Sequence, residues 1–147
     1  MPAAQREADV VWEGDLLNGS GRVKMRSSAV PEFPVTWASR TDQQANGKTS
    51  PEELLAAAHA SCFSMALSAA LARNRTPGQR LQVSAVSTFD KVGDGWKVMK
   101  MELSVMGKVQ GIDQNRFEEL ARTAGANCPI SNALKNNVEI VVHAKLE

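Results

Sequence analysis

The chain has 147 residues, enough for one hydrophobic core, and we predict a single domain over residues 1–147. Its 17 Lys and Arg residues against 16 Asp and Glu residues give a net charge of +1, which offers no electrostatic reason to expect nucleic acid or a membrane surface as a partner. Two cysteines and an N-terminus without an apolar export segment predict a cytoplasmic protein with free thiols.

The N-terminal third predicts short β-strands followed by a loop. Residues 10–17 are apolar enough for a strand, and the turn signal Asn18–Gly21 returns the chain into a second strand over residues 22–30. Two prolines then interrupt the pattern, so we expect residues 33–38 to form a third strand at the sheet edge. The polar residues 39–49 predict an exposed loop.

That loop contains a short sequence typical of phosphate-binding loops. Gly47, Lys48 and Thr49 match the last residues of the motif, which also requires a glycine five positions before Gly47. Asp42 occupies that position. We therefore do not predict a phosphate site there.

A long apolar helix is predicted next. Ser50 suits the N-cap, Pro51 the first helical position, and Glu53 completes a capping box three residues after the cap. No charged residue occurs from Leu54 to Leu71, so we expect this helix to be buried on most faces. Ala, Ser and His dominate over Leu and Ile, which favours a core helix over a membrane span. Covering such a helix needs more surface than one chain supplies, and we therefore expect a dimer around it.

The C-terminal half predicts a mixture of strands and helices. Residues 81–92 and 96–106 form the strands of a hairpin around a Gly-Asp-Gly turn. Asp113 caps a helix that runs to about Gly125, with Phe117, Leu120 and Ala121 as its apolar stripe. A shorter helix begins at Pro129, and alternating residues predict a last strand over 138–146. The fold class is therefore α+β.

The two cysteines are the candidates for chemistry. Cys62 lies in the middle of the long helix, where a cysteine usually packs as a small hydrophobic side chain. Cys128 lies at a helix N-terminus, directly before Pro129, where backbone N–H groups favour a thiolate. On these residues alone, Cys128 is the better candidate nucleophile.

The histidines offer a less favoured alternative, a zinc site. His59 lies three residues before Cys62, and these two together with Cys128 and His143 give four side chains, two His and two Cys, of types that zinc accepts. No pair has the C-x-x-C spacing of structural zinc sites. We expect His59 to be a packed core residue and His143 to lie on a strand face.

Several segments together resemble the OsmC/Ohr family of thiol peroxidases. The resemblance rests on Ser50–Leu54, Ala57–Ala60 and Cys62–Leu67 in the long helix, Trp12–Asp15 near the start, Gly111–Asp113, and Cys128–Ser131. The His-Ala-x-Cys-Phe-Ser-Met run and the Trp-Glu-Gly-Asp segment are closer to the OsmC branch than to the Ohr branch.

The resemblance implies an intertwined homodimer with β-sheets packed around central helices. It also implies a peroxidase that acts in oxidative and osmotic stress, without a cofactor or metal, on organic hydroperoxides, with hydrogen peroxide as a further candidate substrate. Cys62 is then the attacking thiol and Cys128 the resolving one, the reverse of the order that the residues alone suggest. An external dithiol of the lipoyl or thioredoxin type regenerates the pair.

A buried nucleophilic thiol requires a nearby cation, because burial disfavours the thiolate. The family places an arginine there, held by a glutamate. Glu52 matches the glutamate and Arg40 the arginine, with Arg22 and Arg26 as alternatives.

Ten residues separate Glu52 from Cys62, a rise of roughly 15 Å along a helix. We therefore expect each site to combine Cys62 of one chain with Glu52 of a second chain. The alternative function is a non-catalytic dimer that binds a lipid-like ligand in an apolar pocket.

Overall fold

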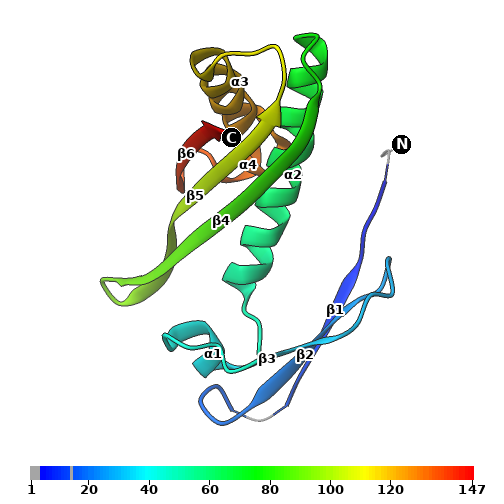
Figure 1. The fold of residues 1–147 in the computed structure, drawn as a ribbon. Helices are drawn as coiled ribbons and strands as arrows, with labels where there is room; N and C mark the ends of the chain where they lie inside the picture. The colour runs from blue at the N-terminus through cyan, green and yellow to red at the C-terminus, as the bar shows by residue number, and fades with distance from the viewer. Residues whose placement is uncertain (1–3, 14) are drawn as a thin grey trace. The chain divides into compact units, whose positions relative to one another are not determined.

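The computed structural model describes residues 4–13 and 15–147, and its chain contacts form two compact units, residues 1–51 and 52–147 (Figure 1). Each unit contains one small three-stranded sheet together with helices. The predicted α+β class is confirmed. Gly14, part of the Trp12–Asp15 segment noted above, lies outside the described residues.

The first unit is built on an antiparallel sheet of β1 (Ala8–Glu13), β2 (Ser20–Met25) and β3 (Phe33–Val35), in that order. The predicted hairpin and third strand are therefore confirmed, although each strand is shorter than expected. Gly21 on the central strand is required by packing. A Cβ atom there would lie 2.8 Å from Val35 Cγ2 and 2.9 Å from Trp12 Cε3.

The segment between β3 and the long helix differs from the prediction. Residues 33–38 were expected to be a strand and residues 39–49 a loop, but helix α1 (Trp37–Thr41) interrupts both. Thr36 and Ser39 form its capping box, each side chain accepting from the other residue's backbone N–H at 3.0 Å. This helix buries no side chain, so no apolar periodicity could reveal it.

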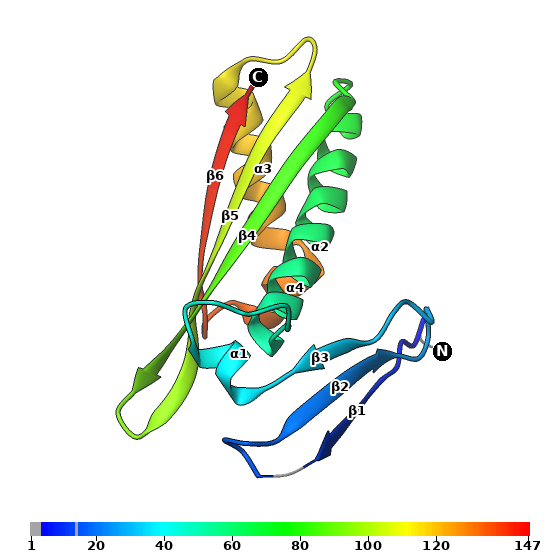
Figure 2. The same cartoon turned by 60° about the horizontal axis from the view of Figure 1, so that its bottom comes forward.

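The second unit contains a sheet in the order β4-β5-β6: β4 (Gly78–Val92), β5 (Gly95–Val109) and β6 (Glu139–Leu146). β4 and β5 form the predicted antiparallel hairpin, and Gly93 has a φ of 60° in its turn. β6 pairs in parallel with β5, but only from Lys100 to Gly107. The hairpin therefore continues beyond the three-stranded part as a two-stranded ribbon (Figure 2).

Helix α2 (Pro51–Arg73) is the predicted long helix, and it is continuous. It ends in a Schellman motif, in which the N–H of Thr76 donates to the carbonyl of Leu71 and that of Arg75 to Ala72, both at 3.0 Å. Arg75 takes the left-handed conformation that this motif requires, with φ 61°. Pro77 follows at the position where a helix cannot continue.

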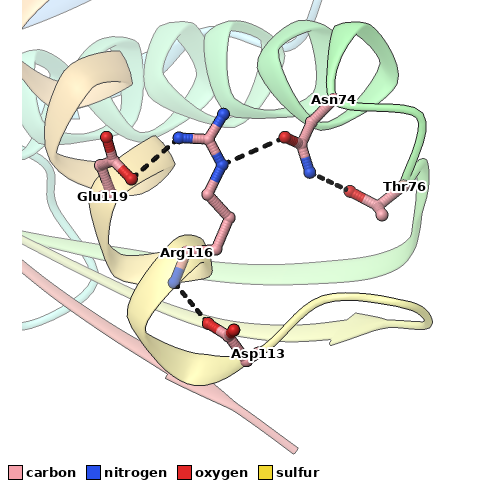
Figure 3. A network of polar contacts seen from close by, with 5 residues as sticks. All are labelled: Asn74, Thr76, Asp113, Arg116 and Glu119. Carbon is pink, nitrogen blue, oxygen red and sulfur yellow. Dashed lines mark hydrogen bonds and ion pairs between the residues drawn. The ribbon is translucent and has the colours of Figure 1, made fainter.

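The C-terminal end of α2 is joined to the start of α3 (Gln114–Asn127) by a polar network (Figure 3). Arg116 Nε donates to Asn74 Oδ1 at 3.1 Å, and an Arg116 terminal nitrogen donates to Glu119 at 2.8 Å. Asp113 is the N-cap of α3, as predicted, and accepts from the N–H of Arg116 at 2.8 Å. The two helices are thus fixed to each other at one end.

Helices α2 and α3 lie on the same face of the second sheet, and the core forms between them (Figure 2). Phe63, Leu67 and Leu71 of α2 meet Leu103 of β5 and Phe117 of α3, and all five side chains are fully buried. Burying each such side chain contributes about 1.5–3 kcal/mol before the loss of conformational entropy is counted. The second unit therefore carries most of the hydrophobic core.

The remaining faces of α2 are open in the single chain. Only 28% of an 18-residue apolar stretch of this helix is buried, and Met65 is 72% exposed. By length and composition alone this helix is capable of crossing a membrane, a property that the core helix of a soluble protein also shows. The prediction that α2 is buried on most faces is wrong for one chain, because the sheet and α3 cover one side of it.

Candidate active site

A proline places Cys128 between two helices. The pyrrolidine ring of Pro129 disfavours the helical conformation for the residue before it, and Cys128 is accordingly extended, with φ −63° and ψ 147°. Helix α3 therefore ends at Asn127, and α4 (Pro129–Leu134) begins directly afterwards. Cys128 is the N-cap of α4, as predicted, and its side chain is 1% exposed.

The structure brings Cys62 from the middle of α2 to this helix junction. Its side chain is half-buried, and it interacts with the Cys128 thiol and with the backbone of Ile130 in α4. Both cysteines are free thiols. The two thiols, 66 positions apart in the sequence (128 − 62), therefore interact across this junction.

The environment of Cys62 opposes ionisation. Burial raises the pKa of the Cys62 thiol above its ordinary value of 9.0, and the Cys128 thiol raises it further, whereas the hydrogen bond with the Ile130 backbone lowers it. Burial is the largest of these effects. A positive charge brought close to Cys62 would favour its thiolate.

A buried polar pair, His59 and Ser131, adjoins Cys128. His59 Nε2 lies 2.7 Å from Ser131 Oγ, and Ser131 Oγ lies 3.1 Å from Cys128 Sγ. The backbone N–H of Ser131 also donates to Cys128 Sγ, at 3.4 Å. His59 and Ser131 are both fully buried, so these contacts are shielded from water.

His59 is the packed core histidine that the sequence predicts, but its hydrogen-bond partner was missed. Ser131 stands three residues after the N-cap Cys128, at the position whose N–H an N-cap side chain normally accepts. That spacing was the one available signal. It did not identify His59 as the second contact, because the two residues are 72 positions apart.

Glu52 lies in the first turn of α2 and is 7% exposed, whereas its neighbour Glu53 is exposed. Because α2 is continuous from Pro51 to Arg73, the roughly 15 Å rise between Glu52 and Cys62 holds in the folded chain. The structure therefore does not bring Glu52 to the thiol of its own chain.

The three candidate arginines belong to the first unit. Arg40 lies in the last turn of α1, with its guanidinium carbon 5.8 Å from the centroid of the Trp37 ring. Arg22 is paired with Glu32 at 2.8 Å. Arg26 is paired with Glu7 at 3.0 Å and with Asp9 at 3.4 Å.

Two further features bear on ligands. Among the described residues, no group of three or more His, Cys, Asp or Glu side chains is arranged to hold a metal ion, and His143 lies on β6 opposite Ser104. A shallow groove runs along the open side of α2, past Met65 and Ser68 to Leu81, and Cys62 is not among the residues that line it.

Comparison with known proteins gives one consistent result. The family model described as OsmC-like protein matches residues 43–143. The chain is 36% identical over 129 residues to the Peroxiredoxin OsmC of Escherichia coli, covering 88% of this chain and 89% of that protein. It is 30% identical to the Organic hydroperoxide resistance protein OhrA of Bacillus subtilis, covering 88% of this chain and 86% of that protein.

Solved structures share the fold. An organic hydroperoxide resistance protein from Elizabethkingia anophelis matches with a TM-score of 0.75 at 21% identity, covering 99% of this chain and all of that one. A protein of the same description from Legionella pneumophila matches with a TM-score of 0.74, also at 21% identity, covering 99% of each chain. With two thiols in contact and a family model over most of its length, the chain belongs to the OsmC-like protein family.

Proposed function

We propose that this protein is a soluble, cytoplasmic thiol peroxidase that reduces organic hydroperoxides with Cys62 and Cys128. The observation that carries the proposal is the contact between the two thiols, one on α2 and one at the start of α4. The curated relatives named peroxiredoxin and organic hydroperoxide resistance proteins support the same reaction class.

Cys62 is the attacking thiol because it is the more accessible of the two, half-buried against 1% exposed for Cys128. Its thiolate attacks one peroxide oxygen, the O–O bond breaks, and the other oxygen leaves with a proton as alcohol, or as water from hydrogen peroxide. Cys62 becomes a sulfenic acid. The Cys128 sulfur then bonds to the Cys62 sulfur, and the sulfenic oxygen leaves as water.

An external dithiol completes the cycle by reducing the disulfide to two thiols. Dithiols of the lipoyl and thioredoxin types are the two candidates, because both form a stable cyclic disulfide on oxidation. Recycling assays with each reductant, run at equal concentrations, identify which one supports multiple turnovers.

The cation that Cys62 needs is Arg40 in this proposal, held by Glu52. Arg40 occupies the sequence position that best matches the arginine of the family, and Arg22 and Arg26 are the alternatives. These two form exposed ion pairs, with Glu32 and with Glu7 and Asp9, which stabilise by only about 0–1 kcal/mol. Glu52 is suited to hold an arginine because it is only 7% exposed, and burying a carboxylate costs free energy unless it is paired and hydrogen-bonded.

The assembly that combines these groups is a homodimer. The single chain separates Glu52 from Cys62 along one helix and leaves most of the apolar surface of α2 open. A second copy packed against α2 covers that surface and brings its own Glu52 toward the first chain's Cys62. A completed peroxide pocket then contains side chains from both chains.

Stopped-flow mixing of the reduced protein with cumene hydroperoxide tests the proposal. We expect two thiols to be lost per chain for each molecule of alcohol formed, within seconds. Loss of no thiol over minutes would contradict the peroxidase and favour the alternative, a dimer that binds a lipid-like ligand on its apolar surface. Equal thiol loss with hydrogen peroxide at matched concentrations would show that the pocket does not select for an organic group.

A further inference from the structure

The chemistry described so far uses both sulfur atoms but neither His59 nor Ser131. These two side chains are fully buried, and they form a continuous run of polar contacts from Cys128 Sγ through Ser131 Oγ to His59 Nε2. Buried polar groups cost free energy unless they are paired, so a buried run of polar contacts is retained for structure or for function.

At the His59 end of this run of contacts, one ring nitrogen has no hydrogen-bond partner among the described residues. This atom, Nδ1, is buried. A histidine kept for structure alone usually satisfies both ring nitrogens, since an unpaired buried group costs about 1–3 kcal/mol. Nε2, the nitrogen directed at Ser131, is the acceptor in the tautomer that carries the ring proton on Nδ1, the nitrogen without a partner in the described part of the chain.

The charge state of His59 suits a proton acceptor. Burial lowers the pKa of the His59 imidazole below its ordinary value of 6.5, so the ring is neutral at pH 7 and one nitrogen carries a free lone pair. Cys128, at the start of α4, is a titratable group in direct contact with Ser131, and Cys62, on the same helix as His59, interacts with Cys128. Neither is a permanent charge that would hold a proton on the ring.

We propose that Ser131 and His59 relay the proton of the Cys128 thiol while Cys128 closes the disulfide with Cys62. The inference rests on the proposed function, because closure is the second half of that reaction. Cys128 S–H donates to Ser131 Oγ, and Ser131 O–H donates to His59 Nε2. Ser131 contacts the reacting sulfur directly and His59 acts through Ser131, and neither touches the peroxide.

The atoms balance along this route. The Cys128 sulfur bonds to the Cys62 sulfur, so Cys128 is oxidised and the Cys62 sulfenic sulfur is reduced. The S–O bond of the sulfenic acid breaks, and its oxygen leaves as hydroxide. The thiol proton moves to Ser131 as the serine proton moves to His59. The imidazolium then releases a proton and the hydroxide takes one, which makes the net products a disulfide and water.

The relay acts on closure and not on peroxide attack, which makes it separable by experiment. Rapid quenching with mass spectrometry counts sulfenic acid at Cys62 and disulfide separately after one equivalent of cumene hydroperoxide. In His59→Gln, the glutamine amide keeps a hydrogen bond to Ser131 but cannot accept the proton. We expect sulfenic acid formation to change less than about twofold and closure to slow by roughly 100-fold, the low end of general base contributions.

Three further variants sharpen the result. Ser131→Ala breaks the relay at its middle and is expected to slow closure as much as His59→Gln does. The double variant is expected to be no slower than either single variant, because the two residues act as one unit. His143→Gln, which removes the other histidine from an exposed position on β6, is the matched control and should close the disulfide at the wild-type rate.

The pH profile distinguishes a proton acceptor from a structural contact. Wild-type closure is expected to slow as the pH falls through the pKa of folded His59, which burial lowers below its ordinary value of 6.5, and His59→Gln is expected to lose this acid limb. A His59→Gln protein that closes at the wild-type rate, or that keeps the acid limb, would overturn the relay.

A second experiment, with diamide in place of the peroxide, tests the relay independently of the peroxidase proposal. Diamide oxidises the Cys62 thiol to an adduct, and Cys128 then displaces the reduced reagent, so the same proton must leave Cys128 without any peroxide. Slow closure in His59→Gln with diamide supports the relay even if the wild type ignores cumene hydroperoxide, which would contradict the peroxidase alone. Equal closure by wild type and variant with diamide overturns the relay alone.

Discussion

The two sulfur atoms are separated by accessibility as well as by sequence. Cys62 is half-buried on α2, and Cys128 is 1% exposed at the junction of α3 and α4. We therefore expect Cys62→Ser to abolish peroxide consumption, and Cys128→Ser to permit a single turnover that ends in a sulfenic acid. Alcohol formed per chain, measured with excess hydroperoxide and no reductant, should be zero and one respectively.

The opposite assignment has its own signature. If Cys62→Ser still formed a sulfenic acid at Cys128, detected by a dimedone adduct on that residue, the N-terminus of α4 would be the reactive position. Chemical reactivity would then follow the backbone N–H groups around Cys128 and not the exposure of Cys62.

Arg40 provides the second prediction at this scale. It is a side chain of the short helix α1, which buries no residue, so Arg40→Ala should change the free energy of unfolding by less than about 0.5 kcal/mol. Loss of a cation beside the Cys62 thiolate should slow sulfenic acid formation by on the order of 100-fold. Arg22→Ala, which breaks only the pair with Glu32, is the matched control, and equal rates for Arg40→Ala and wild type would transfer the role to another arginine.

His59 links stability to pH. Because burial lowers the pKa of the folded imidazole, the unfolded chain binds the proton more readily below about pH 6.5. The stability that the neutral ring contributes is therefore present above about pH 6.5 and is lost as the pH falls below that value toward the lower pKa of the folded ring. Urea titrations should show the wild type losing its advantage over His59→Gln as the pH falls below about 6.5, and a constant difference would contradict this.

At the scale of single elements, β5 contains a glycine that packing requires. A Cβ atom at Gly107 would lie 2.5 Å from Cζ of Phe117, a fully buried ring of α3 that has no room to move. Gly107→Ala should lower the free energy of unfolding by about 1–3 kcal/mol, measured by urea denaturation. Gly95→Ala on the same strand meets nothing closer than 3.9 Å, and a loss as large there would refute the packing explanation.

Elements with strong local signals were predictable from the sequence. The capped helix α3, the Gly-Asp-Gly hairpin and the long apolar run of α2 each carry their pattern within a few residues. Helix α1 was missed because a five-residue helix with no buried side chain has only its capping box as a signal. The His59–Ser131 contact was missed for the opposite reason, since it depends on where α4 packs against α2 and no local pattern encodes that.

At the scale of the whole molecule, the continuous helix α2 predicts that active sites are shared between chains. Cys62→Ser and Glu52→Ala proteins should each be inactive or nearly so, but each heterodimer formed by subunit exchange should regain one intact site. We expect about half of wild-type peroxidase activity per heterodimer. Exchange is confirmed separately by mass labelling of one variant.

The contrary result is equally informative. No recovery of activity, despite confirmed exchange, would place Glu52 and Cys62 in the same chain. Because α2 is unbroken from Pro51 to Arg73, that outcome would require its first turns to unwind in the active protein.

The unequal strand lengths of the second sheet have a consequence for its opening motions. β6 pairs only with residues 100–107 of β5, and the ribbon beyond it has two strands, with the stacked rings of Phe89 and Trp96 5.1 Å apart near its tip. Two-stranded ribbons are marginally stable, and amide protons exchange with solvent through local opening. Deuterium should therefore enter the hairpin from its tip, fastest near Gly93 and slowest around Leu103. The single strand β5 would then contain both amides that exchange by local opening and amides that exchange only on global unfolding.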